Sequence, residues 1–335
     1  MTLRVLRPGL YTTVQDLGRY GLQHLGVVPC GAMDAVAHRL ANALVGNEPG
    51  AATLECTVIG PELQFEQAAL VALYGAAFEA TLEGEAMPQN RPVLLPAGAR
   101  LRVGRTLRGV RGYLAVAGGI CVPAVLGSRS TYVPATYGGL EGRALRVGDV
   151  IALAAAAPAL AAARFARLRN ARTAARFRST GWHVEAMTLP SGATIAVRAM
   201  EGRHYAEFDA GSKRAFFDAT WRISQDSNRM GFRLLGPALV RRSSGELLSE
   251  PTCLGTVQAP ADGSVIVLMA DHQTTGGYPK IAEVAGADVA LLSQLAPGGG
   301  LRFARCSAGE ARDALRGLHA KIESIIRGIE LQYGG

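Results

Sequence analysis

Residues 95–103 read LPAGARLRV, and two later stretches repeat the same design: LRVGDVIAL at 145–153 and LAPGGGLRF at 295–303. Each begins with an apolar residue, continues through a turn that contains glycine, and ends in a run where apolar side chains recur. Glycine supplies backbone angles that tight turns require, and alternation with a period of two is typical of a strand with one buried face. The recurrence predicts a chain assembled from related β modules.

The region around the first of these stretches supports a β-rich interpretation. Between residues 63 and 116, short apolar runs alternate with glycine and proline, as in PVLLPAGARLRVG and GYLAVAGG. The chain has 335 residues, of which 49% are hydrophobic and 6% aromatic, with 41 glycines and 16 prolines. This composition suits short strands joined by tight turns, and the length is sufficient for two domains with separate cores. We expect a mainly β protein with peripheral helices.

One early segment has helical periodicity. In AMDAVAHRLANALVG (32–46) the apolar side chains recur at the i, i+3, i+4 spacing of one helical face, and Gly46 follows as a stop signal. Asp34, His38 and Asn42 fall on the opposite side. The pattern predicts an amphipathic helix that covers a barrel.

Changes in composition divide the chain. Residues 154–192 are rich in alanine and arginine, so we interpret them as a linker between a first module, 1–153, and a second module, 193–306. A capping-box pattern, SAGE, then begins a C-terminal amphipathic helix over 307–331. The apolar stripe of that helix requires a surface to cover, either on this chain or on a partner.

A polar motif occurs once in each predicted module. QDLGRYG (15–21) and QDSNRMG (225–231) share Gln-Asp, an Arg three residues after the Asp, and a Gly two residues later. One interpretation is that each Asp pairs with the Arg that follows it and stabilises a turn. The other is that Arg19 and Arg229 offer forked donors to a carboxylate, carbamate or phosphate, while the Gln and Asp side chains orient an amide. The two copies would then face one cleft between the modules.

The richest polar stretch, MADHQTTGGYPKIAEV (269–284), follows an apolar strand, SVIVL. Polar side chains after a buried strand, with consecutive glycines that let a ligand approach the backbone, are typical of a small-molecule site. The stretch lacks the spacing of a P-loop, so backbone N–H groups and hydroxyls would make any phosphate contact. A plain β-turn with threonine side chains bonded to the backbone explains the same residues.

Composition disfavours several classes of function. The five cysteines are scattered and the six histidines never reach ligand spacing, so we expect neither a disulfide framework nor a metal site. The net charge of +8 comes largely from arginines in the predicted linker, so we expect no nucleic-acid partner. We expect no signal peptide and no membrane span, and the expected compartment is a reducing cytoplasm.

The wording of the chain resembles the allophanate hydrolase subunit 2 family, which includes the C subunit of 5-oxoprolinase, the carboxyltransferase domain of urea carboxylase and the antagonist of the sporulation-kinase inhibitor. The resemblance covers most of residues 3–305. Eight ordered blocks carry it: TTVQDLGRYG, GAMDAVAHRLANALVGN, ATLECTVIGPELQF, RGYLAVAGGI, VLGSRSTY, QDSNRMGFRLLGP, SEPTCLGTVQAPADG and ADHQTTGGYPKIAEVAGAD.

The resemblance implies a fold, a reaction and partners. It implies tandem cyclophilin-like β-barrel modules, and a heteromer with the B-type and A-type proteins of 5-oxoprolinase. Together these proteins would use ATP, with Mg²⁺, to open 5-oxo-L-proline to L-glutamate. Two alternatives follow from the other members of the family. One is a carboxyltransferase subunit that acts on urea or a related amide with biotin on a partner, and the other is a non-catalytic antagonist that binds a kinase-inhibitor protein.

The family motifs also imply site residues. Both reactions need a cleft that orients a small amide and stabilises charge on oxygen. The candidate catalytic residues are Asp34, Asn42, Arg19, Arg229 and Asp271. The candidate substrate-binding residues are Gln15, Asp16, Asp226, Asn228, Gln273, Thr274, Thr275, Gly276 and Gly277.

Three positions depart from the family pattern. Cys30 stands where the family usually has Ser, Asp226 where it has Gln, and His272 where it has Arg. The change at His272 removes a fixed cation from beside the QTTGG stretch, so it bears on the identity of the substrate.

Overall fold

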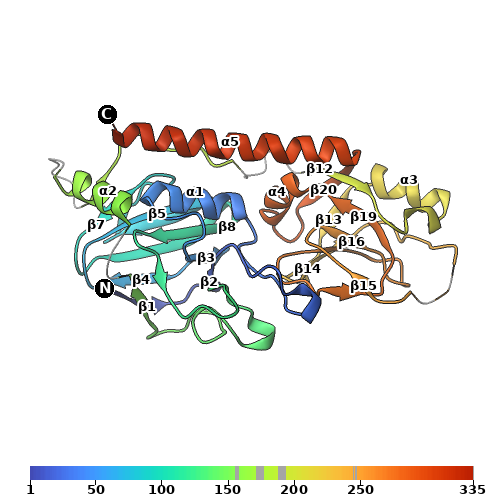
Figure 1. The fold of residues 1–335 in the computed structure, drawn as a ribbon, viewed down its shortest axis with the longest axis horizontal. Helices are drawn as coiled ribbons and strands as arrows, with labels where there is room; N and C mark the ends of the chain where they lie inside the picture. The colour runs from blue at the N-terminus through green and yellow to red at the C-terminus, as the bar shows by residue number, and fades with distance from the viewer. Residues whose placement is uncertain (155–157, 171–176, 188–193, 244, 246, 335) are drawn as a thin grey trace. The chain divides into compact units, whose positions relative to one another are not determined.

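The computed structural model describes residues 1–335 apart from 155–157, 171–176, 188–193, 244, 246 and 335. The protein is mainly β with a few helices, which confirms the fold class expected from the sequence (Figure 1). By contacts between residues the chain divides into two compact units. Unit 1 comprises Met1–Arg19, Asp34–Leu189 and Ile322–Gly335, and unit 2 comprises Tyr20–Met33 and Pro190–Lys321.

Unit 1 is built on one antiparallel sheet of 11 strands. The strands are β1 (Thr2–Arg7), β2 (Tyr11–Gln15), β3 (Thr53–Thr57), β4 (Glu62–Phe65), β5 (Ala69–Leu82), β6 (Glu85–Ala86), β7 (Val93–Leu95), β8 (Arg100–Val116), β9 (Ile120–Cys121), β10 (Val150–Leu153) and β11 (Arg178–Ser179). The main path runs β11-β7-β5-β8-β4-β1-β10-β9, and β2 joins the sheet through β3, which pairs with β8. The longest ladder joins β5 and β8.

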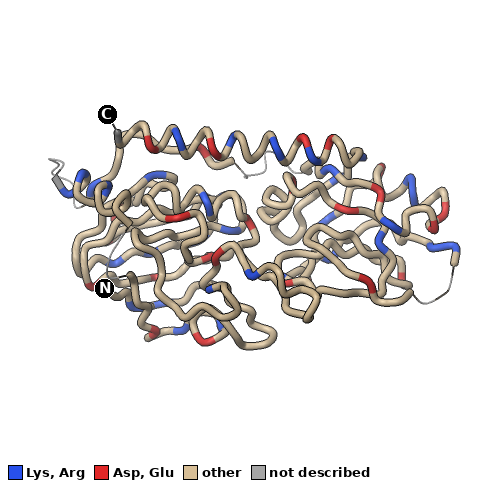
Figure 2. Tube along the Cα trace, viewed as in Figure 1, with Lys and Arg blue, Asp and Glu red and all other residues tan. Residues whose placement is uncertain are grey.

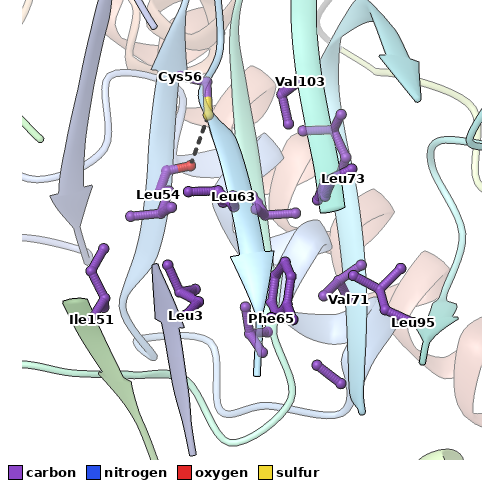
Figure 3. Close-up of a cluster of buried hydrophobic side chains, with 14 of the residues drawn as sticks. Leu3, Leu54, Cys56, Leu63, Phe65, Val71, Leu73, Leu95, Val103 and Ile151 are labelled. Carbon is purple, nitrogen blue, oxygen red and sulfur yellow. Dashed lines mark hydrogen bonds between the residues drawn. The ribbon is translucent and has the colours of Figure 1, made fainter. Parts of the chain in front are cut away.

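The core of unit 1 lies on the inner faces of these strands. Figure 3 shows side chains from different strands pointing toward one another, among them Leu3 of β1, Phe65 of β4 and Val71 of β5. All three are completely buried. Burial of each such side chain contributes about 1.5–3 kcal/mol, so this cluster holds the sheet together.

Helix α1 (Ala35–Val45) lies across the face of this sheet (Figure 1). It confirms the helix predicted from the apolar spacing. Asp34 is its N-cap and accepts a hydrogen bond from the N–H of Ala37 at 2.9 Å, and Gly46 ends the helix with a φ of 81°. The polar side is not open to water, because His38 and Asn42 are as completely buried as the apolar face.

Unit 2 contains a closed barrel of seven strands. They are β12 (Thr194–Glu201), β13 (Trp221–Ile223), β14 (Gly231–Leu235), β16 (Thr256–Gln258), β17 (Val265–Leu268), β19 (Lys280–Val284) and β20 (Gly300–Arg305). The order around the barrel is β12-β19-β16-β17-β14-β13-β20, with β12 and β20 parallel. A separate pair, β15 (Glu250–Pro251) and β18 (Thr275–Gly276), lies outside the barrel. Met33, from the early segment of unit 2, belongs to the barrel's hydrophobic core.

The three turn-and-strand stretches are confirmed, and they share one hydrogen-bond pattern. Gly98, Gly148 and Gly298 have φ values of 80°, 89° and 83°, as position i+2 of a type II turn requires. The N–H of each glycine donates to the carbonyl of a strand residue. The N–H of that strand residue donates to the carbonyl of the residue that follows the glycine. The strand residues are Phe65 for Gly98, Val5 for Gly148 and Ile223 for Gly298. The same local unit therefore occurs twice in unit 1 and once in unit 2.

The structure describes further helices in both units. They are α2 (Ala159–Asn170), α3 (Ala210–Asp218), α4 (Val289–Ser293), α5 (Ala308–Gly334) and the short 3-10 turns η1 (Gln23–Leu25), η2 (Val133–Ala135), η3 (Tyr205–Glu207) and η4 (Gly286–Asp288). Helix α2 falls in the predicted linker, 154–192, of which 155–157, 171–176 and 188–192 lie outside the described residues.

Helix α5 confirms the predicted capping box. The Glu310 carboxylate accepts from the N–H of Ser307 at 2.7 Å, and the N–H of Glu310 donates to the Ser307 hydroxyl at 3.2 Å. Ile322 and Ile329 of its apolar stripe are buried, so the chain itself covers that part of the stripe. Figure 2 shows basic and acidic residues interspersed along the same helix.

Candidate functional site

The first polar motif follows β2 in unit 1, where Asp16 is the acceptor for four hydrogen bonds. The hydroxyls of Ser128 and Ser130 and the N–H of Arg129 donate to its carboxylate at 2.6 Å each, and the N–H of Gly18 donates at 2.8 Å. Burial raises the pKa of Asp16, but these four hydrogen bonds outweigh it and hold the pKa below its ordinary value. The buried side chain is therefore a carboxylate that ties the motif to the segment 128–130.

Arg19 of the same motif is 2% exposed and is held by carbonyl groups. Its Nη2 donates to the carbonyl of Ser130 at 2.5 Å and its Nε to that of Val125 at 3.3 Å, and its guanidinium lies over the ring of Tyr137 at 4.8 Å. Its Nη1 is buried and has no hydrogen-bond partner among the described residues. In the described part of unit 1 no carboxylate lies within 4 Å of it, so the interpretation in which Asp16 pairs with Arg19 is wrong.

Gln15 repeats this arrangement. Its Nε2 donates to the carbonyl of Thr131 at 3.2 Å and to the hydroxyl of Thr13 at 3.1 Å. Its Oε1 is buried and, among the residues described, has no partner. Gln15 and Arg19 thus bond to the consecutive carbonyls of Thr131 and Ser130, and each presents one unpaired polar atom.

Asn42, the candidate residue in α1, belongs to a buried hydrogen-bond network. Asn42 Nδ2 donates to the carbonyl of Ala51 at 2.8 Å and lies 3.3 Å from His38 Nε2, and His38 Nδ1 lies 3.0 Å from the Thr53 hydroxyl. Thr53 in turn donates to the carbonyl of Gln15 at 3.5 Å. This hydrogen-bond network connects α1 to the first motif within unit 1. Burial lowers the pKa of His38 to about 4, so its ring is neutral near neutral pH.

The second motif, in unit 2, has a different arginine environment. Nε and Nη2 of Arg229 both donate to the Asp271 carboxylate at 2.9 Å, and Nη2 also donates to the carbonyl of Gly31 at 2.6 Å. The side chains of this ion pair are 7% and 4% exposed. Asp226 and Asn228 are exposed, and Asn228 accepts from the N–H of Met230 at 2.8 Å. Arg229 and Asp271 are brought together, and they tie the early segment of unit 2 to the barrel.

The polar loop after β17 is held by backbone hydrogen bonds to β15 and to the residue that follows it. The N–H of Thr252 donates to the carbonyl of Thr274 at 2.9 Å, and β18 pairs with β15 at Thr275 and Gly276. A Cβ on Gly276 would lie 2.8 Å from Nε2 of Gln258, so no larger residue fits without displacing that side chain. Nε2 of Gln258 is buried and has no partner among the residues described, and it was not among the residues singled out from the sequence.

His272 fixes the peptide that begins this loop. Its Nδ1 lies 2.7 Å from the carbonyl of Gln273, and the Thr252 hydroxyl donates to the same carbonyl. A carbonyl oxygen only accepts, so Nδ1 carries the proton. Burial lowers the pKa of His272 below its ordinary value, and the ring is therefore neutral near neutral pH.

A cavity of about 210 Å³ in unit 2 is lined by His272 and by the early segment of this unit. Its polar walls come from Tyr20, Gln23, Cys30, Thr252, Cys253 and His272. Cys30 and His272, two of the three departures from the family pattern, therefore line the same cavity. Sequence reasoning missed Tyr20, Thr252 and Cys253, because only folding brings them beside His272.

Two further features of the described residues bear on function. No group of three or more His, Cys, Asp and Glu side chains in this part of the chain could hold a metal ion. A search of the described helices finds none that is both long and apolar enough to cross a bilayer.

Comparison with known proteins identifies the class. The family model for the carboxyltransferase domain, subdomain A and B, matches residues 25–305. The chain belongs to this family. A solved structure of urea carboxylase from Kluyveromyces lactis has a TM-score of 0.86 at 30% identity, and the match covers 96% of this chain and 29% of that one. This chain thus corresponds to less than a third of the urea carboxylase chain.

Relatives of similar length are more specific. The chain is 41% identical over 312 residues to the C subunit of 5-oxoprolinase from Escherichia coli K12, a match that covers 93% of this chain and 94% of that one. It is 35% identical over 315 residues to the corresponding C subunit from Haemophilus influenzae, a match that covers 94% of both chains.

Proposed function

We propose that this chain is the C subunit of an ATP-dependent 5-oxoprolinase. The observation that carries the proposal is the identity of 41% to the E. coli C subunit along nearly the whole length of both chains. The name of that relative implies further subunits, and we propose a heteromer with a B-type and an A-type protein of 5-oxoprolinase. The five cysteines of this chain form no disulfide bond, which supports a reducing compartment, for which we propose the cytoplasm.

The reaction that we propose is the opening of 5-oxo-L-proline to L-glutamate. The lactam C–N bond breaks, one water supplies a hydroxyl to the carbonyl carbon and a proton to the nitrogen, and hydrolysis of ATP by a second water drives the step. Such a reaction requires groups that position the amide and stabilise charge on its oxygen. We assign Mg-ATP to the complex as a whole and to no residue of this chain.

Within this chain, we propose that Arg19 binds the substrate carboxylate. A buried guanidinium without a carboxylate partner is costly, and its unpaired Nη1 is available to an anion. Gln15 is also a proposed substrate contact, because its Oε1 is unpaired and can accept a hydrogen bond. Asp16, Asp34 and Asn42 would position these two groups, since their side chains are committed to hydrogen bonds within unit 1.

Within unit 2, we propose that the loop residues Gln273, Thr274, Thr275, Gly276 and Gly277 contact substrate. Consecutive glycines allow close approach to the backbone here, which supports the assignment. Arg229 and Asp271 act as positioning residues, because the pair holds the carbonyl of Gly31 beside the cavity. Asp226 and Asn228 remain candidate contacts on the exposed side of the second motif.

We also propose that the two units are tandem cyclophilin-like barrel modules. The shared type II turns at Gly98, Gly148 and Gly298 support a common design. The closed seven-stranded barrel of unit 2 supports it further.

A biotin-dependent carboxyltransferase is the second candidate function. The TM-score of 0.86 to urea carboxylase favours it, and biotin would then be carried by a partner. The substrate would be urea or a related amide. The two candidates differ in products, because only the first forms glutamate and only the second needs a biotinylated partner.

Reconstitution tests the proposal. The chain is mixed with its B-type and A-type partners, and ADP and glutamate are measured with and without 5-oxo-L-proline. We expect both products to form together and only when all three proteins and the substrate are present. Failure of 5-oxo-L-proline to stimulate ATP hydrolysis, together with carboxylation of urea when a biotinylated carrier is added, would replace this proposal with the second candidate.

A further inference from the structure

The hydrogen bonding of His272 leaves one ring nitrogen with a defined chemical role. Nδ1 is the donor to the carbonyl of Gln273 at 2.7 Å, so Nε2 of the neutral ring is a lone-pair acceptor. Nε2 makes no hydrogen bond with any described residue. His272 is 4% exposed and lines the cavity of about 210 Å³, where the acceptor would meet a ligand.

The walls of this cavity carry no formal charge. The residues that line it are Tyr20, Gln23, Cys30, Thr252, Cys253 and His272 together with three apolar residues, and none is Lys, Arg, Asp or Glu. An uncharged cavity favours a neutral group, because burying an unpaired charge is costly. The volume is below the range of about 300–1,000 Å³ that is typical for drug-sized ligands, so it suits a small ring.

The cavity is held in place from two sides. Arg229 fixes one wall by donating to the carbonyl of Gly31, next to Cys30. Cys30 has a φ of 56°, a conformation unfavourable for a residue with a side chain, so neighbouring contacts must maintain it. Thr252 fixes a second part of the wall through its hydrogen bonds to Gln273 and Thr274. The site is therefore formed before a ligand binds.

We propose that this cavity binds the neutral lactam ring of the substrate and that Nε2 of His272 accepts the hydrogen bond from the ring N–H. The identity of the lactam rests on the proposed function. The new element is the residue that accepts the hydrogen bond from its N–H. His272 orients the amide and excludes ligands that carry a charge at this point. The substrate carboxylate stays outside the uncharged walls.

Protection of a thiol tests binding without any need for activity. Cys253 lines the cavity and is exposed, and Cys121 in unit 1 is an exposed thiol that serves as an internal control. The full chain is alkylated with N-ethylmaleimide at about pH 8.5, since burial raises the pKa of the Cys253 thiol. Peptide mass spectrometry then reports the rate at each cysteine with 2-pyrrolidinone, 5-oxo-L-proline or L-glutamate present.

We expect both lactams to slow alkylation of Cys253 by about tenfold at ten times their dissociation constant, with no change at Cys121. L-Glutamate, which has no lactam, should give no protection. Equal protection by glutamate, or no protection by either lactam, would overturn the inference.

Two variants of His272 identify the acceptor. His272→Asn retains a donor near the position of Nδ1 and removes Nε2, whereas His272→Gln places an amide oxygen near the position of Nε2. We expect protection by 2-pyrrolidinone to need at least about tenfold more ligand in His272→Asn and within about threefold of the wild-type amount in His272→Gln. Unchanged protection in His272→Asn would contradict the role of Nε2.

The outcome is separable from that of the proposed function. If the reconstituted complex forms glutamate but no lactam protects Cys253, the cavity inference fails and the function stands. If lactams protect Cys253 and the complex forms no glutamate, the cavity binds small lactams and the proposed reaction fails.

Discussion

The two copies of the Gln-Asp-x-x-Arg motif have almost the same sequence and opposite environments. In unit 1 the aspartate is buried and saturated with donors, whereas the arginine retains an unpaired Nη1. In unit 2 the aspartate is exposed, and the arginine makes a bidentate pair with Asp271. The difference arises from residues distant in the sequence: the segment 128–130 in one case and Asp271 in the other.

The comparison separates a structural arginine from a candidate binding arginine. A buried guanidinium that its own chain neutralises has little left to offer an anion, and losing its partner leaves an uncompensated charge. A buried guanidinium bonded only to carbonyls still attracts an anion. The sequence of the motif therefore does not determine the role of its arginine. The groups that bond to the arginine determine it.

The largest expected effect is on the ion pair of unit 2. Asp271→Ala leaves Arg229 buried without its carboxylate, so we expect the free energy of unfolding to fall by about 3–5 kcal/mol. Denaturant titration measures the loss. Asp226→Ala, at the exposed aspartate of the same motif, is the matched control and should change stability by less than about 0.5 kcal/mol. Equal effects of the two changes would show that Asp271 is not the structural partner.

The next effect concerns Asp16 in unit 1 and depends on pH. Because the folded state lowers its pKa, its contribution to stability is complete above its ordinary pKa, near pH 4, and is lost as the pH falls through the folded pKa. We expect Asp16→Asn to destabilise the protein at neutral pH by about 2 kcal/mol and to flatten the decline of stability below about pH 4. Unfolding followed from pH 6 to about pH 3 would check this. An acid profile that is as steep in the variant as in the wild type would contradict the assignment.

The smallest effect on stability should come from two serines, one beside each copy of the motif: Ser128, which bonds to Asp16, and Ser227, which follows Asp226. Ser128→Ala removes a buried hydrogen bond to Asp16, so we expect a loss of about 1 kcal/mol in the free energy of unfolding. Ser227 lies after Asp226 in the other copy. Its hydroxyl donates to the carbonyl of Arg233 at 3.3 Å and accepts from the N–H of Arg233 at 3.1 Å, both at an exposed site. Ser227→Ala should cost less than about 0.5 kcal/mol. Reversal of this order would break the distinction between the copies.

Features that depend on neighbouring residues could be predicted from the sequence. The turns at Gly98, Gly148 and Gly298 need a particular φ at one position, and the helix cap at Ser307 needs a side chain within one turn of the backbone. Each such requirement involves only residues that are close together in the sequence. The periodicity that predicted α1 is local as well, although it did not reveal that the polar side of the helix is buried.

Features that depend on distant residues could not be predicted. Nothing in the sequence of residues 20–33 indicates that Met33 enters the core of unit 2, or that the carbonyl of Gly31 accepts a hydrogen bond from Arg229. The pairing of Arg229 with Asp271 spans 42 residues. The family resemblance implied Arg229 and Asp271 as site residues. It did not distinguish a positioning role from contact with substrate.

Arg19 provides the most direct test of the account. Arg19→Lys keeps the charge but removes the forked donors, so it should weaken binding of a carboxylate. In the reconstituted complex we expect KM for 5-oxo-L-proline to rise by at least about tenfold, which corresponds to about 1.4 kcal/mol, while kcat changes less. Thermal unfolding of the same variant monitors the fold. An unchanged KM in a variant that remains folded would contradict the claim that Arg19 binds the substrate carboxylate.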